Sequence, residues 1–128
     1  MLILQLNDIK KLLTKVGYKN FFLQLIDTVE SDYKNWFEFD KKPRLANHFE
    51  FGVIELMPIS NPHYYAFKYV NGHPNNPLKN KLTVMATGQL SLCSTGEPLL
   101  YSEMTLLTAL RTAATSAMVA KHVADKDS

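Results

Sequence analysis

The spacing of apolar residues changes twice along this chain, and that change limits the folds it can adopt. Up to about residue 40, apolar residues recur every three to four positions, as on one face of a helix. From Leu45 to Tyr101 they alternate with polar residues, as in strands buried on one side. From Glu103 to about Val123 the helical spacing returns. This order of helices, sheet and helix predicts an α+β fold.

Two helices are predicted before the sheet. Asn7 or Asp8 can cap the first helix. The second should run to about Asp40, because Pro43 disfavours helix at the residue before it. Its apolar stripe predicts core packing and comprises Phe22, Leu25, Ile26, Val29, Tyr33, Trp36 and Phe37. The apolar run Leu2–Leu4, ahead of both helices, is a candidate edge strand.

The sheet is predicted to be mixed but mostly antiparallel, with five to six strands. The strands are expected at Ala46–Phe49, Val53–Pro58, Tyr64–Val70, Leu82–Leu92 and Pro98–Tyr101. Turn-forming residues separate them, and Thr95-Gly96 predicts a hairpin. After the sheet, Ser102 can cap the long C-terminal helix, and Glu103 suits the positive end of its dipole. No Rossmann domain is expected, because the chain has no Gly-x-Gly-x-x-Gly sequence.

Length and composition exclude several classes of protein. A chain of 128 residues forms one domain, and its net charge of +2 comes from scattered basic residues that make no footprint for nucleic acid or an anionic membrane. Cys93 is the only cysteine, and the first residues do not resemble a secretory signal. The four histidines lack metal-ligand spacing. We therefore expect a soluble cytoplasmic protein without a metal site.

Arg111 is the least expected charge in the sequence. Its helix is otherwise built from apolar and small hydroxyl residues, so it should be buried on most sides. A buried guanidinium is costly unless it meets an anion. That anion can be an internal Asp or Glu, or it can be the carboxylate or phosphate of a ligand, which the planar guanidinium binds with two parallel hydrogen bonds.

Two further charges stand inside apolar strands. Alternation places Lys68 on the face of Tyr64, Ala66 and Val70, where its ammonium either reaches solvent at an edge or points into a polar cavity. From the sequence alone, the position at the edge of the sheet is favoured for Lys68. Glu55 is the opposite case, a carboxylate that should be paired if its strand is buried.

Arg44, just before the first long strand, completes a possible set, although it can also be a plain surface charge. If Arg44, Glu55, Lys68 and Arg111 converge, the cations can hold an α-carboxylate and the glutamate can hold an ammonium. The pattern is that of a site for a zwitterion. Spacing along the chain does not establish the convergence.

Several segments carry sequence motifs that resemble those of one known protein family. They are Arg44–His48, Gly52–Pro58, Phe67–Pro74, Leu82–Ala86, Leu99–Thr105 and Ala109–Ser116. They resemble the amino-terminal portion of the ornithine cyclodeaminase/mu-crystallin family, which also holds ketimine reductases and an archaeal alanine dehydrogenase. The motifs Glu-Leu-Met-Pro and Lys-Tyr-Val-Asn-Gly-His-Pro resemble the cyclodeaminases of this family more than its reductases.

The resemblance implies an activity and a role for each residue of the set. The family's cyclodeaminases convert L-ornithine to L-proline and ammonia with bound NAD. Arg44 and Lys68 would bind ornithine, mainly its carboxylate, and Glu55 would line the same pocket. Thr83 and Arg111 would reach the nucleotide, with Arg111 also close to the substrate.

The resemblance also implies how the domain is used. Residues 1–128 would form a substrate-binding and dimerisation domain that pairs through its sheet into a homodimer. The family's catalytic aspartate lies in a Rossmann domain that would follow, so no catalytic residue is expected here. We expect this chain alone to be inactive. The alternatives are a non-enzymatic dimerisation or amino-acid-binding module, or part of a related ketimine reductase or amino-acid dehydrogenase.

Overall fold

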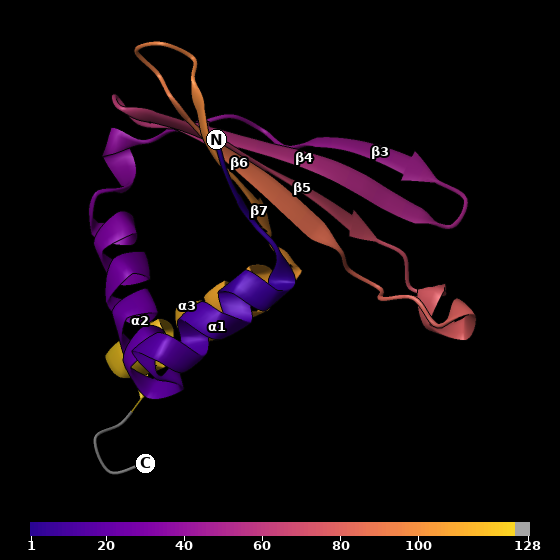
Figure 1. Cartoon of the computed structure of the whole chain (residues 1–128), viewed down its shortest axis with the longest axis horizontal. Helices are drawn as coiled ribbons and strands as arrows, with labels where there is room; N and C mark the ends of the chain where they lie inside the picture. The colour runs from indigo at the N-terminus through magenta and orange to yellow at the C-terminus, as the bar shows by residue number, and fades with distance from the viewer. Residues whose placement is uncertain (125–128) are drawn as a thin grey trace.

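The chain folds into a twisted sheet with a group of helices packed at one end of it. The computed structural model describes residues 1–124. The helices are α1 (Leu6–Val16), α2 (Tyr18–Lys34) and α3 (Thr105–Val123), with short 3₁₀ turns η1 (Trp36–Glu38) and η2 (Asn76–Lys79). Figure 1 shows α1 and α2 beside α3, while β3 and β4 extend away from them. The α+β prediction is confirmed.

The sheet has seven strands among the described residues and is mixed, as predicted. They are β1 (Leu2–Leu4), β2 (Asp40–Lys41), β3 (Leu45–Phe49), β4 (Gly52–Ser60), β5 (Tyr64–Gly72), β6 (Ala86–Leu92) and β7 (Pro98–Glu103). Their order is β1-β7-β6-β5-β4-β2, with β3 also paired to β4. The predicted edge strand Leu2–Leu4 is confirmed and lies parallel to β7. All other pairs are antiparallel, so residues 1–124 contain no doubly wound Rossmann sheet.

Strand β4 carries two strands on one edge. Asp40–Lys41 pairs with its end at Ser60 and Ile59, and Leu45–Phe49 pairs with its beginning. The break between these strands contains Arg44, next to Leu45, which is opposite Leu56. Because β5 occupies the other edge of β4, Arg44 is held one strand away from Lys68.

Local hydrogen bonds move two helix starts from their predicted places. Helix α1 begins at Leu6, because Gln5 is its N-cap and its backbone N–H donates to the Asp8 carboxylate. Ser102 is the last but one residue of β7 and does not cap α3. The Glu103 carboxylate instead accepts the backbone N–H of Thr105, as its suitability for the helix dipole had indicated.

The aromatic stripe of α2 is only partly in the core, contrary to prediction. Val29 is buried, but Trp36 is 49% and Phe37 80% exposed. The helix ends at Lys34 and the chain tightens into η1, so the later aromatic residues leave the face that the helical period gave them.

A loop replaces the first part of the strand predicted at Leu82–Leu92. Asn71, at the end of β5, exchanges hydrogen bonds with the Met85 backbone through its own N–H and its side-chain oxygen. The His73 N–H donates to the Thr83 carbonyl. These bonds close residues 73–85 into a loop that contains η2, and β6 begins only at Ala86. The predicted hairpin at Thr95-Gly96 is confirmed between β6 and β7.

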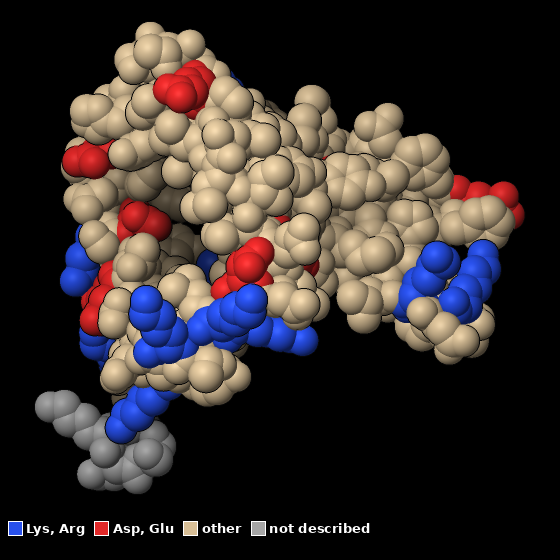
Figure 2. All heavy atoms as spheres, viewed as in Figure 1, with Lys and Arg blue, Asp and Glu red and all other residues tan. Residues whose placement is uncertain are grey.

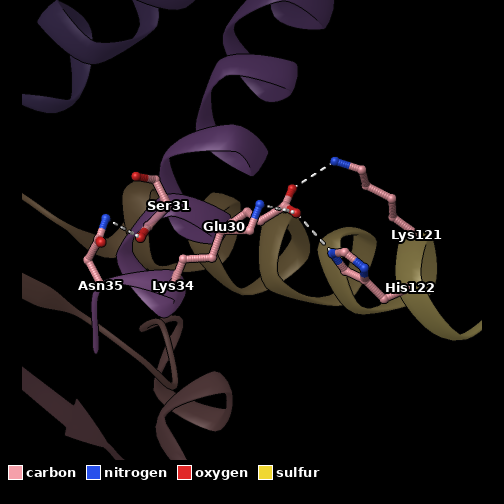
Figure 3. A network of polar contacts seen from close by, with 6 residues as sticks. All are labelled: Glu30, Ser31, Lys34, Asn35, Lys121 and His122. Carbon is pink, nitrogen blue, oxygen red and sulfur yellow. Dashed lines mark hydrogen bonds and ion pairs between the residues drawn. The ribbon is translucent and has the colours of Figure 1, made fainter. Parts of the chain in front are cut away.

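An ion cluster joins α2 to α3. Glu30 on α2 accepts hydrogen bonds from Lys121 at 2.7 Å and His122 at 3.0 Å on α3, and it pairs with Lys34 at 3.1 Å (Figure 3). Its side chain is only 11% exposed. The bonds from Lys121 and Lys34, with help from His122, lower the pKa of Glu30 from 4.5 to about 2.

None of the helices within residues 1–124 is long and apolar enough to cross a membrane. In the same part of the chain, no three His, Cys, Asp or Glu side chains gather as they would around a metal ion.

The Glu30 cluster should make stability depend on acid. A carboxylate whose pKa is depressed by folding stabilises the fold above its unfolded pKa, and this contribution is lost as the pH falls from about 4.5 to about 2. We expect the free energy of unfolding to fall over this range in the wild type and to change less in Glu30→Gln. Denaturant unfolding at several pH values measures both. Parallel curves for the two proteins would contradict the prediction.

Candidate functional site

The two faces of the sheet differ in character. Cross-strand pairing places Met57, Lys68, Gly88, Ser102 and Leu4 in one row on one face. The neighbouring row, on the other face, runs through Leu45, Leu56, Tyr69 and Thr87. The first face looks toward the helices and the second has no covering element within the described residues. Glu55 and Lys68 belong to the first face, whereas Arg44 precedes β3 and Arg111 lies on α3.

A cavity of about 330 Å³ lies on the face that looks toward the helices. Its lining is almost entirely apolar and includes Leu4, Met57, Lys68, Gly88, Met104 and Leu107. A side chain at Gly88 would not fit there, because its Cβ would lie 2.9 Å from the backbone carbonyl oxygen of Phe67 and would also overlap the sulfur of Met104. The start of α3 is thereby seated close to the sheet. Figure 2 shows a recess between the helices and the sheet.

Lys68 brings the one charge into this cavity. Its strand β5 lies between β4 and β6, and its neighbours across the strands are Met57 and Gly88. The alternation predicted from the sequence is confirmed, but the preference for an edge position is wrong. Lys68 stands in the interior of the sheet and forms no ion pair with any residue from 1 to 124.

Arg44 and Glu55 form an ion pair beside Lys68. Arg44 Nη1 donates to Glu55 Oε2 at 3.0 Å, with 22% of the Glu55 side chain exposed. Glu55 lies on β4 two residues before Met57, and therefore on the same face as Lys68. The expectation that this carboxylate is paired is confirmed.

Arg111 is exposed rather than buried. Helix α3 packs against α2, and only Ala114 within it is fully buried, whereas Val123 is 73% exposed. No element within residues 1–124 covers the side that carries Arg111, so the prediction of burial on most sides is wrong here. The alternative of an internal salt bridge is also wrong within this range, because Arg111 pairs with no Asp or Glu there.

The other three charges nevertheless act on Lys68. Burial lowers the pKa of Lys68, and the positive charges of Arg111 and then Arg44 lower it further, while the Glu55 carboxylate raises it. Three cations therefore share one neighbourhood with one carboxylate. An incoming carboxylate is the group that this excess of positive charge favours.

Thr83 lies apart from this group, in the loop between η2 and β6. It is half-buried, and its carbonyl accepts the His73 N–H at 2.9 Å. No recorded hydrogen bond joins it to Arg44, Glu55, Lys68 or Arg111.

Sequence reasoning missed the apolar residues that shape the site. Met57 and Met104 line the cavity around Lys68. Met57 could have been found, because it follows Glu55 by two residues and must share its face. Met104 could not, since its contact with Gly88 joins β6 to the start of α3.

Comparison with known proteins gives this arrangement a family context. Residues 7–128 match the model of the ornithine cyclodeaminase/mu-crystallin family. Ornithine cyclodeaminase of Agrobacterium fabrum is 52% identical over 125 residues, which are 98% of this chain and 35% of that protein. That of Brucella suis is 53% identical over 117 residues, 91% of this chain and 33% of that protein. The chain therefore spans about a third of the length of these curated relatives.

Solved structures agree with the fold. An archaeal alanine dehydrogenase dimer with bound NAD superposes with a TM-score of 0.87 and 32% identity, over 100% of this chain and 38% of its own. The Δ1-pyrroline-2-carboxylate reductase of Thermococcus litoralis, in complex with NADH and L-proline, gives 0.82 and 30% over 100% of this chain and 39% of its own.

The electrostatic coupling within the site can be measured at Lys68. Arg111→Gln should raise the pKa of Lys68, because it removes a nearby positive charge, and Glu55→Gln should lower it, because it removes the compensating carboxylate. Nitrogen-detected NMR titration of the lysine ammonium groups measures both shifts. Lys79→Met, whose ammonium lies over the Phe51 ring, is the control and should leave the value unchanged. Shifts of the same sign in the two test variants would contradict the arrangement.

Proposed function

The chain belongs to the ornithine cyclodeaminase/mu-crystallin family, and we propose that it forms the substrate-binding and dimerisation domain of an NAD-dependent ornithine cyclodeaminase. Such an enzyme converts L-ornithine to L-proline and ammonia. The observation that carries the proposal is the Arg44–Glu55 ion pair beside Lys68, whose own charge is opposed by both Arg44 and Arg111. The chain is 52% and 53% identical to two ornithine cyclodeaminases, and 41% identical over 86 residues to the alanine dehydrogenase of Archaeoglobus fulgidus. These identities favour L-ornithine over the substrates of that dehydrogenase.

The substrate's carboxylate would bind at Arg44 and Lys68. In the described structure Arg44 is paired with Glu55, whereas Lys68 has no ion pair within residues 1–124. A carboxylate that enters beside Lys68 can share the Arg44 guanidinium and free Glu55 to accept a hydrogen bond from the substrate's ammonium group. Each charge of the zwitterion would then meet an opposite charge.

The three cations would oppose the effect of Glu55 on the substrate's ammonium group and would help it lose a proton. Positive charge near the α-amine disfavours its ammonium form, since like charges raise its energy. The apolar cavity beside Lys68 strengthens this effect by keeping water away. These residues bind and orient, and we assign no catalytic acid or base among them.

Thr83 and Arg111 are the proposed contacts to NAD. The exposed guanidinium of Arg111, without an ion pair in residues 1–124, suits a nucleotide phosphate, and the Thr83 hydroxyl can donate a hydrogen bond. The chemistry that NAD supplies when bound is acceptance and return of a hydride. The positive charge of Arg111 also lowers the pKa of Lys68, which supports a proposed position for Arg111 between the nucleotide and the carboxylate.

The open face of the sheet is the proposed dimer interface. Leu45 is 63% exposed, and Leu56, Tyr69, Tyr65 and Phe49 are also exposed on it. A continuous apolar sheet face of this kind favours pairing. The related archaeal alanine dehydrogenase is a dimer, and a second copy of this chain is the occupant that we propose.

For the cellular compartment we propose the cytoplasm, because the one cysteine, Cys93, is exposed and has no disulfide.

Carboxylate recognition can be tested with two diamines. L-Ornithine should bind to this chain, and 1,4-diaminobutane, which lacks only the carboxylate, should bind at least about tenfold more weakly, as expected for loss of a charge-assisted hydrogen bond. Lys68→Met should remove the preference, and Lys79→Met should keep it. Isothermal titration calorimetry of the three proteins with both diamines measures all six affinities. Equal affinities of the wild type for the two diamines would contradict the proposed role of Arg44 and Lys68.

The dimer interface can be tested with one charge. Leu56→Lys places an ammonium in the middle of the open face and should convert the dimer to monomer, because burial of that charge is costly. Leu23→Lys, at an exposed position on α2, is the matched control and should remain dimeric. Sedimentation velocity distinguishes the two states. A monomeric wild type, or dissociation of both variants, would refute the assignment.

A further inference from the structure

A second cavity adjoins the first, on the side toward η1. It measures about 320 Å³ and shares Met57 and Lys68 with the apolar cavity. The other residues that matter are Trp36, Lys41, Lys42 and Arg44. Trp36 is not one of the predicted site residues, because the helical pattern predicts a core position for it.

The lining of this cavity is basic. Three lysines and one arginine contribute to it, and none of the Asp or Glu side chains within residues 1–124 does. Lys42 is paired with Asp40 at 3.0 Å in an exposed ion pair, and Arg44 is paired with Glu55. An anion that enters the cavity therefore meets Lys68 and can compete for Arg44.

The Trp36 ring is held in place although it is half exposed. Tyr33 stacks on it, with ring centroids 5.4 Å apart and planes 10° apart. The Lys41 ammonium lies 4.7 Å from the ring centroid and donates to the carbonyls of Trp36 and Phe39. Lys41 is thus engaged with the ring and the backbone, so it is a positioning residue for Trp36.

Trp36 differs in this respect from the aromatic residue that follows it. Phe37 is 80% exposed and does not line the cavity. An aromatic residue that is merely on the surface needs no fixed orientation. Trp36 has one, and it lines a cavity together with four cationic side chains. An indole held beside cations provides an apolar wall for the carbon chain of an anion.

We propose that Trp36 is a specificity-determining wall of the substrate pocket: its indole packs against the aliphatic side chain of an amino acid whose carboxylate is bound by Arg44 and Lys68. The proposal rests on the proposed function for the identity of the ligand. It adds a residue that reads the length of the side chain, separately from the residues that read its carboxylate.

The chain provides its own probe, because Trp36 is its only tryptophan. L-Ornithine should change the fluorescence of the wild type saturably, with the dissociation constant that calorimetry gives. By calorimetry, Trp36→Ala should weaken L-ornithine binding about tenfold, the scale of a lost aromatic contact, and weaken glycine binding less than about twofold, because glycine has no side chain to reach the wall. Trp36→Phe should restore most of the affinity, and Phe37→Ala should leave both affinities unchanged.

The outcomes separate this proposal from the proposed function. If L-ornithine binds but Trp36→Ala binds it as tightly as the wild type, or loses glycine to the same extent, the wall is refuted and the proposed function stands. If the wild type binds neither L-ornithine nor glycine, the proposed function fails and the wall with it. A selective loss of L-ornithine in Trp36→Ala supports both.

Discussion

The site depends on a positive charge held on an interior strand of the sheet. Lys68 lies between Met57 and Gly88, where burial and two guanidinium groups all oppose its charge. The one nearby carboxylate, Glu55, is already paired with Arg44 at 3.0 Å. No carboxylate within residues 1–124 forms an ion pair with Lys68, and an imbalance of this kind supports the anion site that we propose.

The sheet separates two tasks by its alternation. Residues on one face make the cavities, the cation cluster and the contact with the start of α3. Residues one position along each strand make the open apolar face. A one-residue slip of register would exchange the two sets, so the long antiparallel ladder of β4 with β5 keeps each set on its own face. Ion pairs of Glu30 with Lys121 and His122 join α2 to α3.

Much of the fold followed from the pattern of residues, and the errors have physical causes. The strands at Tyr64 and Val53 and the mixed sheet were predictable because alternation marks strands buried on one side. The start of β6 was not, because it depends on hydrogen bonds between Asn71 and Met85. Trp36 was assigned to the core because the helical period was extended past Lys34, where the helix in fact ends.

The candidate site divides in the same way. The sequence by itself determined which residues are anomalous, since a Lys or Glu inside an apolar strand is recognisable without a structure, and alternation determined the face that Lys68 occupies. Only the tertiary structure decided that Arg44 pairs with Glu55, that the charge of Arg111 on α3 acts on Lys68, and that Trp36 lines one cavity with Arg44 and Lys68. These contacts join residues far apart in the chain, and their geometry comes from strand register and helix packing, which no local pattern encodes.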